Sequence, residues 1–339
     1  MKVLIDYQCI PFYLAHGGLD IQVMSTFYAL KKIGVDVELS KWWDKSQTAD
    51  LIHTFTLPGE LYLQLTNEKN IPVVCTTLFT GDCNVSRFKT LLKRGLVKTT
   101  SALKKLPFFS QLNSFSRWES YNKCSVNIVG LYAEAYLLHN VYEVANEKIH
   151  IVPLGVNDVF LNPKALGNKA EHLITIGTIT ERKGSVELAE LAHQAKVPIL
   201  FVGKPYSEDS DYWKIFTSLI DNKYVKYQSH TDNQEELAKL YANAQGYVLN
   251  SDRENWCLAA HEAVACGLPI LLPDQPWSRE RFSTQAHYFP KTKGSKSEAL
   301  LSFYKDRTKK PPNIKINSWE EVALELLDVY SKALSKKVK

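Results

Sequence analysis

Two glutamates are the residues of this chain whose type and spacing could most clearly do chemistry. Glu254 ends a polar stretch, and Glu262 follows eight positions later among alanine, valine and leucine. A carboxylate in so apolar a segment needs partners, because burying an unpaired charge is costly. Glu262 therefore either holds a backbone segment or an arginine, or accepts hydrogen bonds from ligand hydroxyls. For a lone glutamate the structural interpretation is the commoner one, since structural networks also hold acids.

A pair of bases is the second chemical feature. Arg182 and Lys183 come directly before a predicted helix, Ser185–Ala195. Cations there oppose the positive end of the helix dipole, a small unfavourable effect that an anion between them would reverse. In the alternative interpretation no ligand is bound there: Glu181 and Glu187 compensate the charge, and both bases are solvated.

The elements that must position the glutamates lie between Gly246 and Pro273. This stretch predicts a strand, a polar loop, a short apolar helix with its stop, and a second strand: Tyr247–Leu249, Asn250–Asn255, Trp256–Cys266, Gly267 and Leu268–Leu272. A glycine and then a proline just past the helix form the usual stop. The first amides of such a helix are free and its N-terminal end is positive, so it is a natural phosphate site.

Strands and helices alternate along the rest of the chain. The first predicted strands are Val3–Ile5, Val35–Leu39, Asp50–Phe55, Pro72–Phe79, Ser125–Val129 and Ile149–Pro153. After a polar segment at 162–171 come His172–Ile179, Val197–Val202, Val225–Gln228, Tyr247–Leu249, Leu268–Leu272 and His287–Phe289. The alternation predicts parallel sheets covered by helices on both faces, with ligands beyond the carboxyl ends of the strands.

Composition narrows the class of protein. The chain has 339 residues, 45% of them apolar and 23% charged, as in a globular protein with room for two domains. No run of 18 apolar residues predicts a membrane span, and the N-terminus reads as a strand rather than a signal peptide. The six cysteines lack metal-ligand spacing, which favours reduced cysteines in the cytoplasm. Asp209-Ser210-Asp211 could hold a metal, but it fits better as the start of a helix.

Residues 83–117 carry the most uneven charge of the chain. They contain no acid and eight bases, interleaved with leucine and phenylalanine: Arg87, Lys89, Lys93, Arg94, Lys98, Lys104, Lys105 and Arg117. Basic residues beside apolar ones suit an anionic membrane surface, and they suit a solvated helix equally well. We expect no nucleic-acid partner.

The two glutamates and the residues after them resemble the donor site of the retaining GT-B glycosyltransferases of glycosyltransferase family 4. That family has Glu, seven residues, Glu and a small-residue run ending Cys-Gly-Leu-Pro, and this chain has the same pattern from Glu254 to Pro269. The resemblance implies that Glu262 binds the ribose of a nucleotide sugar and that Glu254 faces the transferred sugar. It also implies that Arg182 and Lys183 bind the donor diphosphate.

Further residues match the family or depart from it. Gly17 and Gly18 match a Gly-Gly loop that reaches toward the donor, and His53 matches a histidine at a strand end, where a structural role is at least as common. The family's Gly-Phe-Gly after the first glutamate is Asn255, Trp256 and Cys257 here; with Leu258 these residues are expected to contact the donor. Two further departures are Leu78, where many relatives have histidine, and Thr178, where they often have arginine.

The resemblance implies a GT-B fold of two Rossmann-like domains facing a cleft. The expected domains are an acceptor domain at 1–160, a nucleotide-sugar domain at 161–318 and a C-terminal helix at 319–339 that crosses back to the first domain. The implied reaction is transfer of a hexose with retention to an acceptor hydroxyl, without metal or cofactor, in synthesis of cell-surface glycan or glycolipid. A UDP-sugar is the default expectation for the donor, and the acceptor is expected to be a saccharide or a lipid-linked molecule. The expected location is the cytoplasm, including the inner face of the membrane.

Two alternatives share part of this pattern. A GT-B sugar-nucleotide epimerase would convert the sugar nucleotide without an acceptor. A non-catalytic relative would bind a nucleotide sugar or a membrane partner and turn nothing over, which fits the altered Gly-Phe-Gly segment and Leu78.

Overall fold

The computed structural model describes residues 1–7, 17–77, 79, 87–103, 118–163 and 170–335. The chain divides into two compact units. The first comprises residues 1–11, 19–154 and 319–339, and the second comprises residues 12–18 and 155–318. The expectations for Leu78 and for two parts of the basic stretch at 83–117, residues 83–86 and 104–117, lie outside the described residues.

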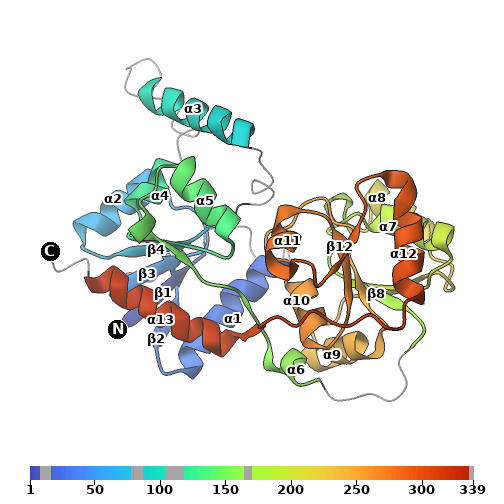
Figure 1. Ribbon diagram of the computed structural model, residues 1–339. Coiled ribbons are helices and arrows are strands. Elements are labelled where there is room, and N and C mark those ends of the chain that lie inside the picture. Colours follow the sequence, from blue (N-terminus) through green and yellow to red (C-terminus); the bar gives the residue numbers. More distant parts are fainter. Residues whose placement is uncertain (8–16, 78, 80–86, 104–117, 164–169, 336–339) are drawn as a thin grey trace. The chain divides into compact units, whose positions relative to one another are not determined.

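The first unit is built on one parallel sheet. In chain order its elements are β1 (Lys2–Asp6), α1 (Gly18–Lys32), β2 (Asp36–Leu39), β3 (Leu51–Thr54), α2 (Glu60–Glu68), β4 (Val73–Thr76), α3 (Arg87–Leu103), α4 (Glu119–Lys123), β5 (Val126–Val129), α5 (Tyr132–Asn140), η3 (Asn146–Lys148), β6 (Ile149–Ile151) and α13 (Trp319–Ser335). The strand order is β2-β1-β3-β4-β5-β6 and every neighbouring pair is parallel. Figure 1 shows α1 and α13 on one face of this sheet and α2, α4 and α5 on the other.

Burial explains why these segments form strands. All four residues of β3, of β4 and of β5 are buried. A strand buried on both faces has no polar side to alternate with, so it reads as an almost continuous apolar run. The sheet order reverses direction between β1 and β3, and ligands of such sheets bind beyond the carboxyl ends of the strands.

The C-terminal helix α13 belongs to the first unit. Tyr330 on α13 is fully buried, and its hydroxyl lies 2.7 Å from His53 Nδ1 at the end of β3. The other ring nitrogen of His53 lies 2.7 Å from the Thr76 hydroxyl, and Lys32 on α1 pairs with Glu320 at 2.7 Å. These contacts fasten the end of the chain to the first sheet.

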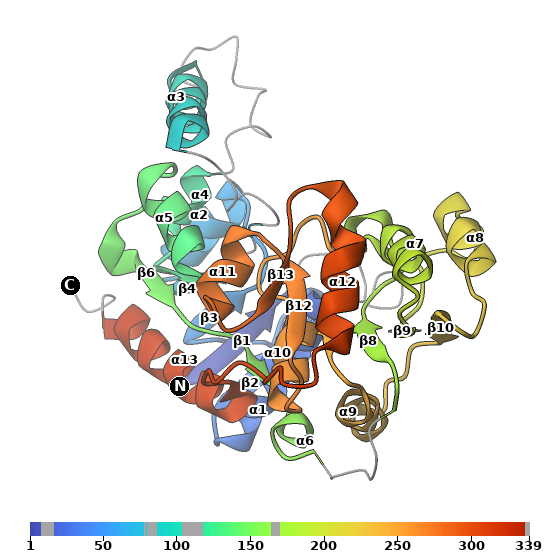
Figure 2. The same ribbon diagram turned by 45° about the vertical axis from the view of Figure 1, so that its right-hand side comes forward.

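The second unit repeats the design. Its elements are β7 (Gly155–Val156), α6 (Asp158–Leu161), β8 (Leu173–Ile176), η4 (Glu181–Lys183), α7 (Ser185–Ala195), β9 (Ile199–Val202), α8 (Asp211–Ser218), β10 (Val225–Gln228), α9 (Gln234–Asn243), β11 (Tyr247–Val248), α10 (Leu258–Ala265), β12 (Ile270–Pro273), α11 (Pro276–Phe282), β13 (His287–Phe289), η5 (Lys293–Ser295), α12 (Lys296–Lys305) and β14 (Asn317–Ser318). Its sheet has the order β10-β9-β8-β11-β12-β13, again all parallel, and β14 pairs with β7. Figure 2 gives a second view of these strands and their helices.

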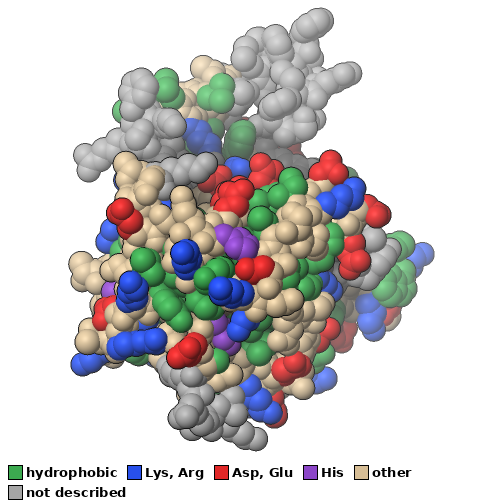
Figure 3. Space-filling model, turned by 90° about the vertical axis from the view of Figure 1, so that its right-hand side faces the viewer, with side chains coloured by type: hydrophobic (Ala, Val, Ile, Leu, Met, Phe, Trp, Pro, Cys, Tyr) green, Lys and Arg blue, Asp and Glu red, His purple; other side chains and the backbone are tan. Residues whose placement is uncertain are grey.

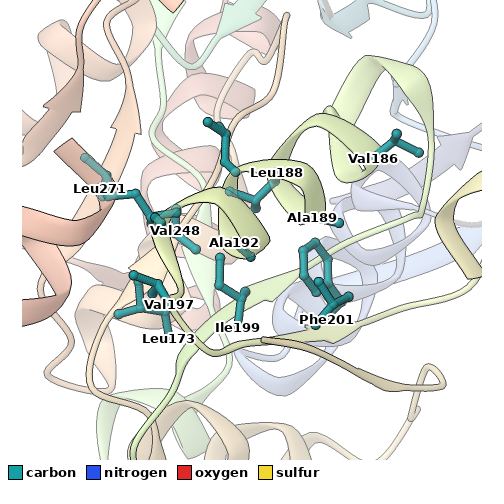
Figure 4. Close-up of a cluster of buried hydrophobic side chains, with 14 of the residues drawn as sticks. Leu173, Val186, Leu188, Ala189, Ala192, Val197, Ile199, Phe201, Val248 and Leu271 are labelled. Carbon is teal, nitrogen blue, oxygen red and sulfur yellow. The ribbon is translucent and has the colours of Figure 1, made fainter. Parts of the chain in front are cut away.

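The core of the second unit holds α7 against its sheet. Leu188, Ala189 and Ala192 on α7 are buried against Ile199 and Phe201 of β9 (Figure 4). At the carboxyl ends of β8 and β9 the backbones come so close that a side chain on Gly203 would lie 2.0 Å from the Gly177 carbonyl oxygen. Only glycine fits there.

The surface shows no large field of one charge on the face drawn in Figure 3, where basic and acidic side chains are interspersed. Among the residues that the structure describes, no helix is both long and apolar enough to cross a membrane.

Candidate active site at the carboxyl end of the second sheet

The helix that carries Glu262 begins later than its sequence predicts. α10 runs from Leu258 to Ala265, so the expectation of a helix from Trp256 is wrong. Cys257 has φ 57° and ψ 73°, a left-handed conformation that cannot continue a right-handed helix. Trp256 therefore lies in the loop, and the predicted stop holds at the other end, where Gly267 has φ 76°.

Gly267 closes α10 with the bonds of a Schellman motif. Its amide donates to the carbonyl of Val264 at 2.9 Å, and the amide of Leu268 donates to that of Ala263 at 2.9 Å. At the N-terminal end the cap is the left-handed Cys257, and no side chain caps the helix. The amides of Ala260 and His261 donate to the Cys257 carbonyl, and no hydrogen bond to a described residue is recorded for those of Leu258 and Ala259. These two amides can meet a ligand, and they follow the carboxyl end of β11, where parallel sheets bind ligands.

Glu254 gathers the two predicted bases. Lys183 Nζ lies 2.6 Å from Glu254 Oε1, and Arg182 Nη1 lies 3.2 Å from the same oxygen. The Ser251 hydroxyl also donates to Oε1, at 2.7 Å. The side chain of Glu254 is 8% exposed and that of Lys183 is 16% exposed. The two residues therefore form a shielded ion pair, with Arg182 at its more exposed side.

The charge state of Glu254 follows from these contacts. Burial alone would raise its pKa, but the charges of Lys183 and Arg182 and the hydrogen bonds from Lys183 and Ser251 outweigh burial and lower the pKa below the usual value. Glu254 is consequently a carboxylate at neutral pH.

The interpretation in which Glu181 and Glu187 compensate the two bases is wrong. Their partner is Glu254 rather than Glu181 or Glu187, and Glu187 instead accepts a hydrogen bond from the Tyr212 hydroxyl at 3.1 Å. The turn that aims Arg182 and Lys183 ends at Gly184, which has φ 64°. A side chain there would lie 2.5 Å from the carbonyl oxygen of Asn250, so the turn packs directly on the loop that leads to Glu254.

Glu262 lies in the first turns of α10 and is almost fully buried. The hydroxyl of Tyr241, on α9, donates to its Oε2 at 2.9 Å. Burial raises the pKa of Glu262 to about 7, although the bond from Tyr241 works in the opposite direction. No cation pairs with Glu262 in the part of the chain that the structure describes, so the arginine partner considered from sequence is absent there.

The two glutamates share one property. Each has one oxygen held by protein donors, Oε1 in Glu254 and Oε2 in Glu262. For the second oxygen of each, no hydrogen bond is recorded from the described residues, and neither oxygen is among the fully buried atoms without a partner. Each carboxylate therefore has one oxygen fixed and one that solvent or a ligand can reach.

The loop between the glutamates is packed by aromatic and charged side chains. Trp256 is buried and stacks on His261, with ring centroids 4.7 Å apart, while the Arg281 guanidinium lies 4.0 Å from the centre of the Trp256 ring. Burial and the neighbouring Arg281 lower the pKa of His261 to about 3. Asn255 Oδ1 and Trp256 Nε1 are buried and have no partner among the described residues.

The remaining predicted residues have different surroundings. Gly18 is the first residue of α1 and Gly17 precedes it, so their expected contact with the donor stays a prediction. His53 is 1% exposed, and burial lowers its pKa to about 3, which favours its structural role. Ser210 caps α8 by accepting a bond from the amide of Trp213, as the structural interpretation of the Asp-Ser-Asp triplet predicts.

Sequence reasoning did not single out three positioning residues. They are Gly177, which lines a small pocket at the end of β8 beside the predicted base Lys183, Ser251, which holds Glu254, and Tyr241, which holds Glu262. The glycine directly after a strand was a visible signal. Ser251 lies only three residues before Glu254, so its contact is local, whereas Tyr241 acts through a contact that spacing does not reveal, since it lies 21 residues from its partner.

One family model matches most of the second unit. Residues 158–319 match the family model of glycosyl transferases group 1. A search of curated protein sequences found no match.

Solved structures match along nearly the whole chain. Sucrose-phosphate synthase from Thermosynechococcus elongatus is similar with a TM-score of 0.73 and 18% identity, covering 99% of this chain and 100% of that one. HepE of Anabaena, solved in complex with UDP-glucose, has a TM-score of 0.63 and 14% identity, covering 100% and 99%. WaaG, a glycosyltransferase involved in lipopolysaccharide biosynthesis, has a TM-score of 0.58 and 15% identity, covering 99% and 98%. At these identities the likeness is one of fold: the chain has the GT-B fold of these glycosyltransferases, and its residues 158–319 match the model of the glycosyl transferases group 1 family.

Proposed function

We propose that this protein transfers a hexose from a UDP-sugar to an acceptor hydroxyl with retention of configuration. The observation that carries the proposal is the pair of buried glutamates, each with one fixed and one reachable oxygen, beside Lys183 and Arg182. Carboxylate oxygens accept bonds from ribose and sugar hydroxyls, and the two cations match a diphosphate. UDP is proposed because HepE, of the same fold, was solved with UDP and with UDP-glucose.

Each site residue has a task in this reaction. Glu262 accepts hydrogen bonds from the ribose, and Glu254 orients the hydroxyls of the transferred sugar. Lys183, Arg182 and the free amides at the start of α10 receive the diphosphate and stabilise the negative charge that develops on it. Asn255, Trp256 and Cys257 line the donor, and Gly17 and Gly18 also contact it.

The chemistry is one bond exchange. The bond between the sugar C1 and the diphosphate oxygen breaks, and C1 bonds to the acceptor oxygen on the same face. The proton of the acceptor hydroxyl passes to the departing phosphate oxygen, so no protein base is needed. The carboxylate of Glu254 favours the positive charge that the sugar carries between these events. Water must be excluded, because it competes as an acceptor.

The acceptor is proposed to be a saccharide or lipid-linked, in the synthesis of a cell-surface glycan or glycolipid. The described part of α3 fits contact with a membrane only in part. Leu91, Leu92 and Leu96 are 59–65% exposed, but Arg94 and Lys98 are both paired with Glu143 at 2.9 Å. Two of the bases of this helix are therefore already engaged within the protein.

The test is release of nucleotide from a panel of UDP-, GDP- and ADP-sugars, with and without membrane extract as a source of acceptors. Transfer predicts that UDP is released from one donor and that Glu254→Ala abolishes the release while UDP still binds. Conversion of the sugar nucleotide without release would favour the epimerase. Binding without turnover in any condition would favour a binding module, and the absence of binding to every nucleotide would refute the proposed site.

A further inference from the structure

A pair of tryptophans projects from the first unit at a turn. Trp42 and Trp43 follow β2 and have exposed fractions of 89% and 65%. Their ring centroids are 5.4 Å apart and the rings are nearly perpendicular. Large apolar side chains are rarely left so exposed in pairs, and an exposed apolar patch commonly marks an interaction site.

The backbone presents these two side chains at the corner of a β-turn. The amide of Asp44 donates to the carbonyl of Lys41 at 2.8 Å, which makes Trp42 and Trp43 the two central residues of the turn. Glycine, proline, asparagine, aspartate and serine are the residues that favour these positions. Two tryptophans there bring no local advantage to folding, which indicates a role in function.

The loop is held firmly behind the turn. The amide of Lys41 donates to Gln47 Oε1 at 2.7 Å, and Gln47 Nε2 donates to the Leu39 carbonyl at 3.0 Å. The amide and the hydroxyl of Ser46 both donate to Asp44 Oδ1, at 3.0 and 2.6 Å. Because the loop is already ordered, little conformational entropy is lost when the tryptophans meet a partner.

Charge around the turn selects the kind of partner. The neighbouring acids are engaged inside the protein: Asp44 holds Ser46, and Glu38 pairs with Lys2 at 2.7 Å. For the exposed ammonium groups of Lys41 and Lys45, no ion pair is recorded with any described residue. The turn therefore offers two indoles and the exposed ammonium groups of Lys41 and Lys45, of which Lys41 also interacts with the charges of Glu38 and Asp44. Indoles beside ammonium groups suit a surface that is anionic outside and apolar beneath.

We propose that the Trp42–Trp43 turn is an anchor that inserts into the interface of an anionic lipid bilayer. Indole suits this zone because its ring is apolar and its N–H is polar, and lysine ammonium groups bind the anionic headgroups. A small soluble ligand fits the turn less well, since small-molecule sites are concave and Trp42 projects into solvent. This surface is separate from α3, and the inference does not rest on the proposed reaction.

The test uses the full-length protein and vesicles of phosphatidylcholine with or without 30% phosphatidylglycerol. We expect co-sedimentation with the anionic vesicles and a blue shift of tryptophan emission. Trp42→Ala/Trp43→Ala should lower the partition coefficient at least tenfold. Lys41→Ala/Lys45→Ala should lower it roughly 25-fold on anionic vesicles at low salt, because each lysine near such a surface contributes about fivefold.

The matched control is Tyr206→Ala/Ile215→Ala, which removes two exposed apolar side chains of the second unit, 58% and 51% exposed, and should leave binding unchanged. Equal melting temperatures and equal UDP binding would show that the variants are folded. The proposal is overturned if the wild-type protein binds no vesicle, or if the tryptophan variant binds like wild type. It is also overturned if only a saccharide, and no vesicle, changes the emission of Trp42 and Trp43.

Discussion

Replacing Glu254 by glutamine should destabilise the free protein and at the same time strengthen its binding of UDP. Glutamine keeps the shape of the side chain and removes its charge. Lys183, which is 16% exposed, then keeps a positive charge in a shielded place without the carboxylate now 2.6 Å away. Any diphosphate that enters the site would restore the missing negative charge.

The size of the effect follows from burial. Removing one partner of a buried ion pair costs about 3–5 kcal/mol, and the lower end applies here because Lys183 keeps some access to solvent. For a domain of this size, a loss of ~3 kcal/mol lowers the melting temperature by roughly 6–12 °C. If the diphosphate regains only ~1.4 kcal/mol of this loss in the variant, affinity for UDP rises about tenfold.

The assay is thermal unfolding with and without UDP, with titration calorimetry for the affinity. Glu254→Gln should melt lower than wild type alone and gain more from saturating UDP. Glu181→Gln is the matched control, because Glu181 is in the same turn and has no ion pair recorded with the described residues; it should change stability by less than ~0.5 kcal/mol. A variant that melts like wild type and binds UDP no more tightly would refute the reasoning.

Three further predictions follow from single contacts. Gly184→Ala should abolish UDP binding and lower the free energy of unfolding in urea by about 1–3 kcal/mol, because the new methyl group would meet the Asn250 carbonyl and the residue has φ 64°. The control is Gly95→Ala, which lies in a helix with open space around it and should be neutral or stabilising. The affinity for UDP, measured by calorimetry, should rise roughly tenfold from pH 6 to pH 8, because Glu262, whose pKa is about 7, becomes a carboxylate. Glu262→Gln should lose this increase of affinity with pH. The same raised pKa means that the contribution of Glu262 to stability is present at acid pH and is lost as pH rises toward 7. Tyr330→Phe should lower the free energy of unfolding in urea by about 1–3 kcal/mol, because the buried His53 would lose its hydrogen bond with the Tyr330 hydroxyl. An unchanged unfolding midpoint would contradict the role of this contact.

The fold was readable from sequence because it depends on local patterns. Apolar runs such as β4 and β5 are buried on both faces, so each strand can be predicted from its own residues without knowledge of its neighbours. Stop signals were equally local, as Gly267 shows by its left-handed conformation at the end of α10. The same reasoning predicted that the Asp-Ser-Asp triplet begins a helix, and Ser210 is the cap of α8.

The site was readable only in part, because its contacts join distant segments. That Arg182 and Lys183 belong with Glu254 could be inferred only from the family pattern, since 72 residues separate Arg182 from Glu254. Residues judged by their nearest charges in sequence were given the wrong partners, Glu181 and Glu187. Tyr241 was invisible because a tyrosine among apolar residues reads as core, and the bond that its hydroxyl donates to Glu262 is formed only in the folded chain.

The segment after Glu254 accommodates a cysteine where the family has glycine. The family's Gly-Phe-Gly suggests that cysteine at position 257 would forbid the glycine conformation, yet Cys257 is left-handed at φ 57°. The cost of about 1–2 kcal/mol for such a residue is met by anchors on both sides: three donors hold Glu254, and the carbonyl of Cys257 lies 3.0 Å from His261 Nδ1. Burial raises the pKa of the Cys257 thiol to about 12, so the new side chain brings no nucleophile. The left-handed conformation before α10 is therefore formed without glycine, while the side chains at 255–257 differ from the family pattern. We expect this chain to depart from its relatives in the sugar it accepts rather than in its binding of the diphosphate.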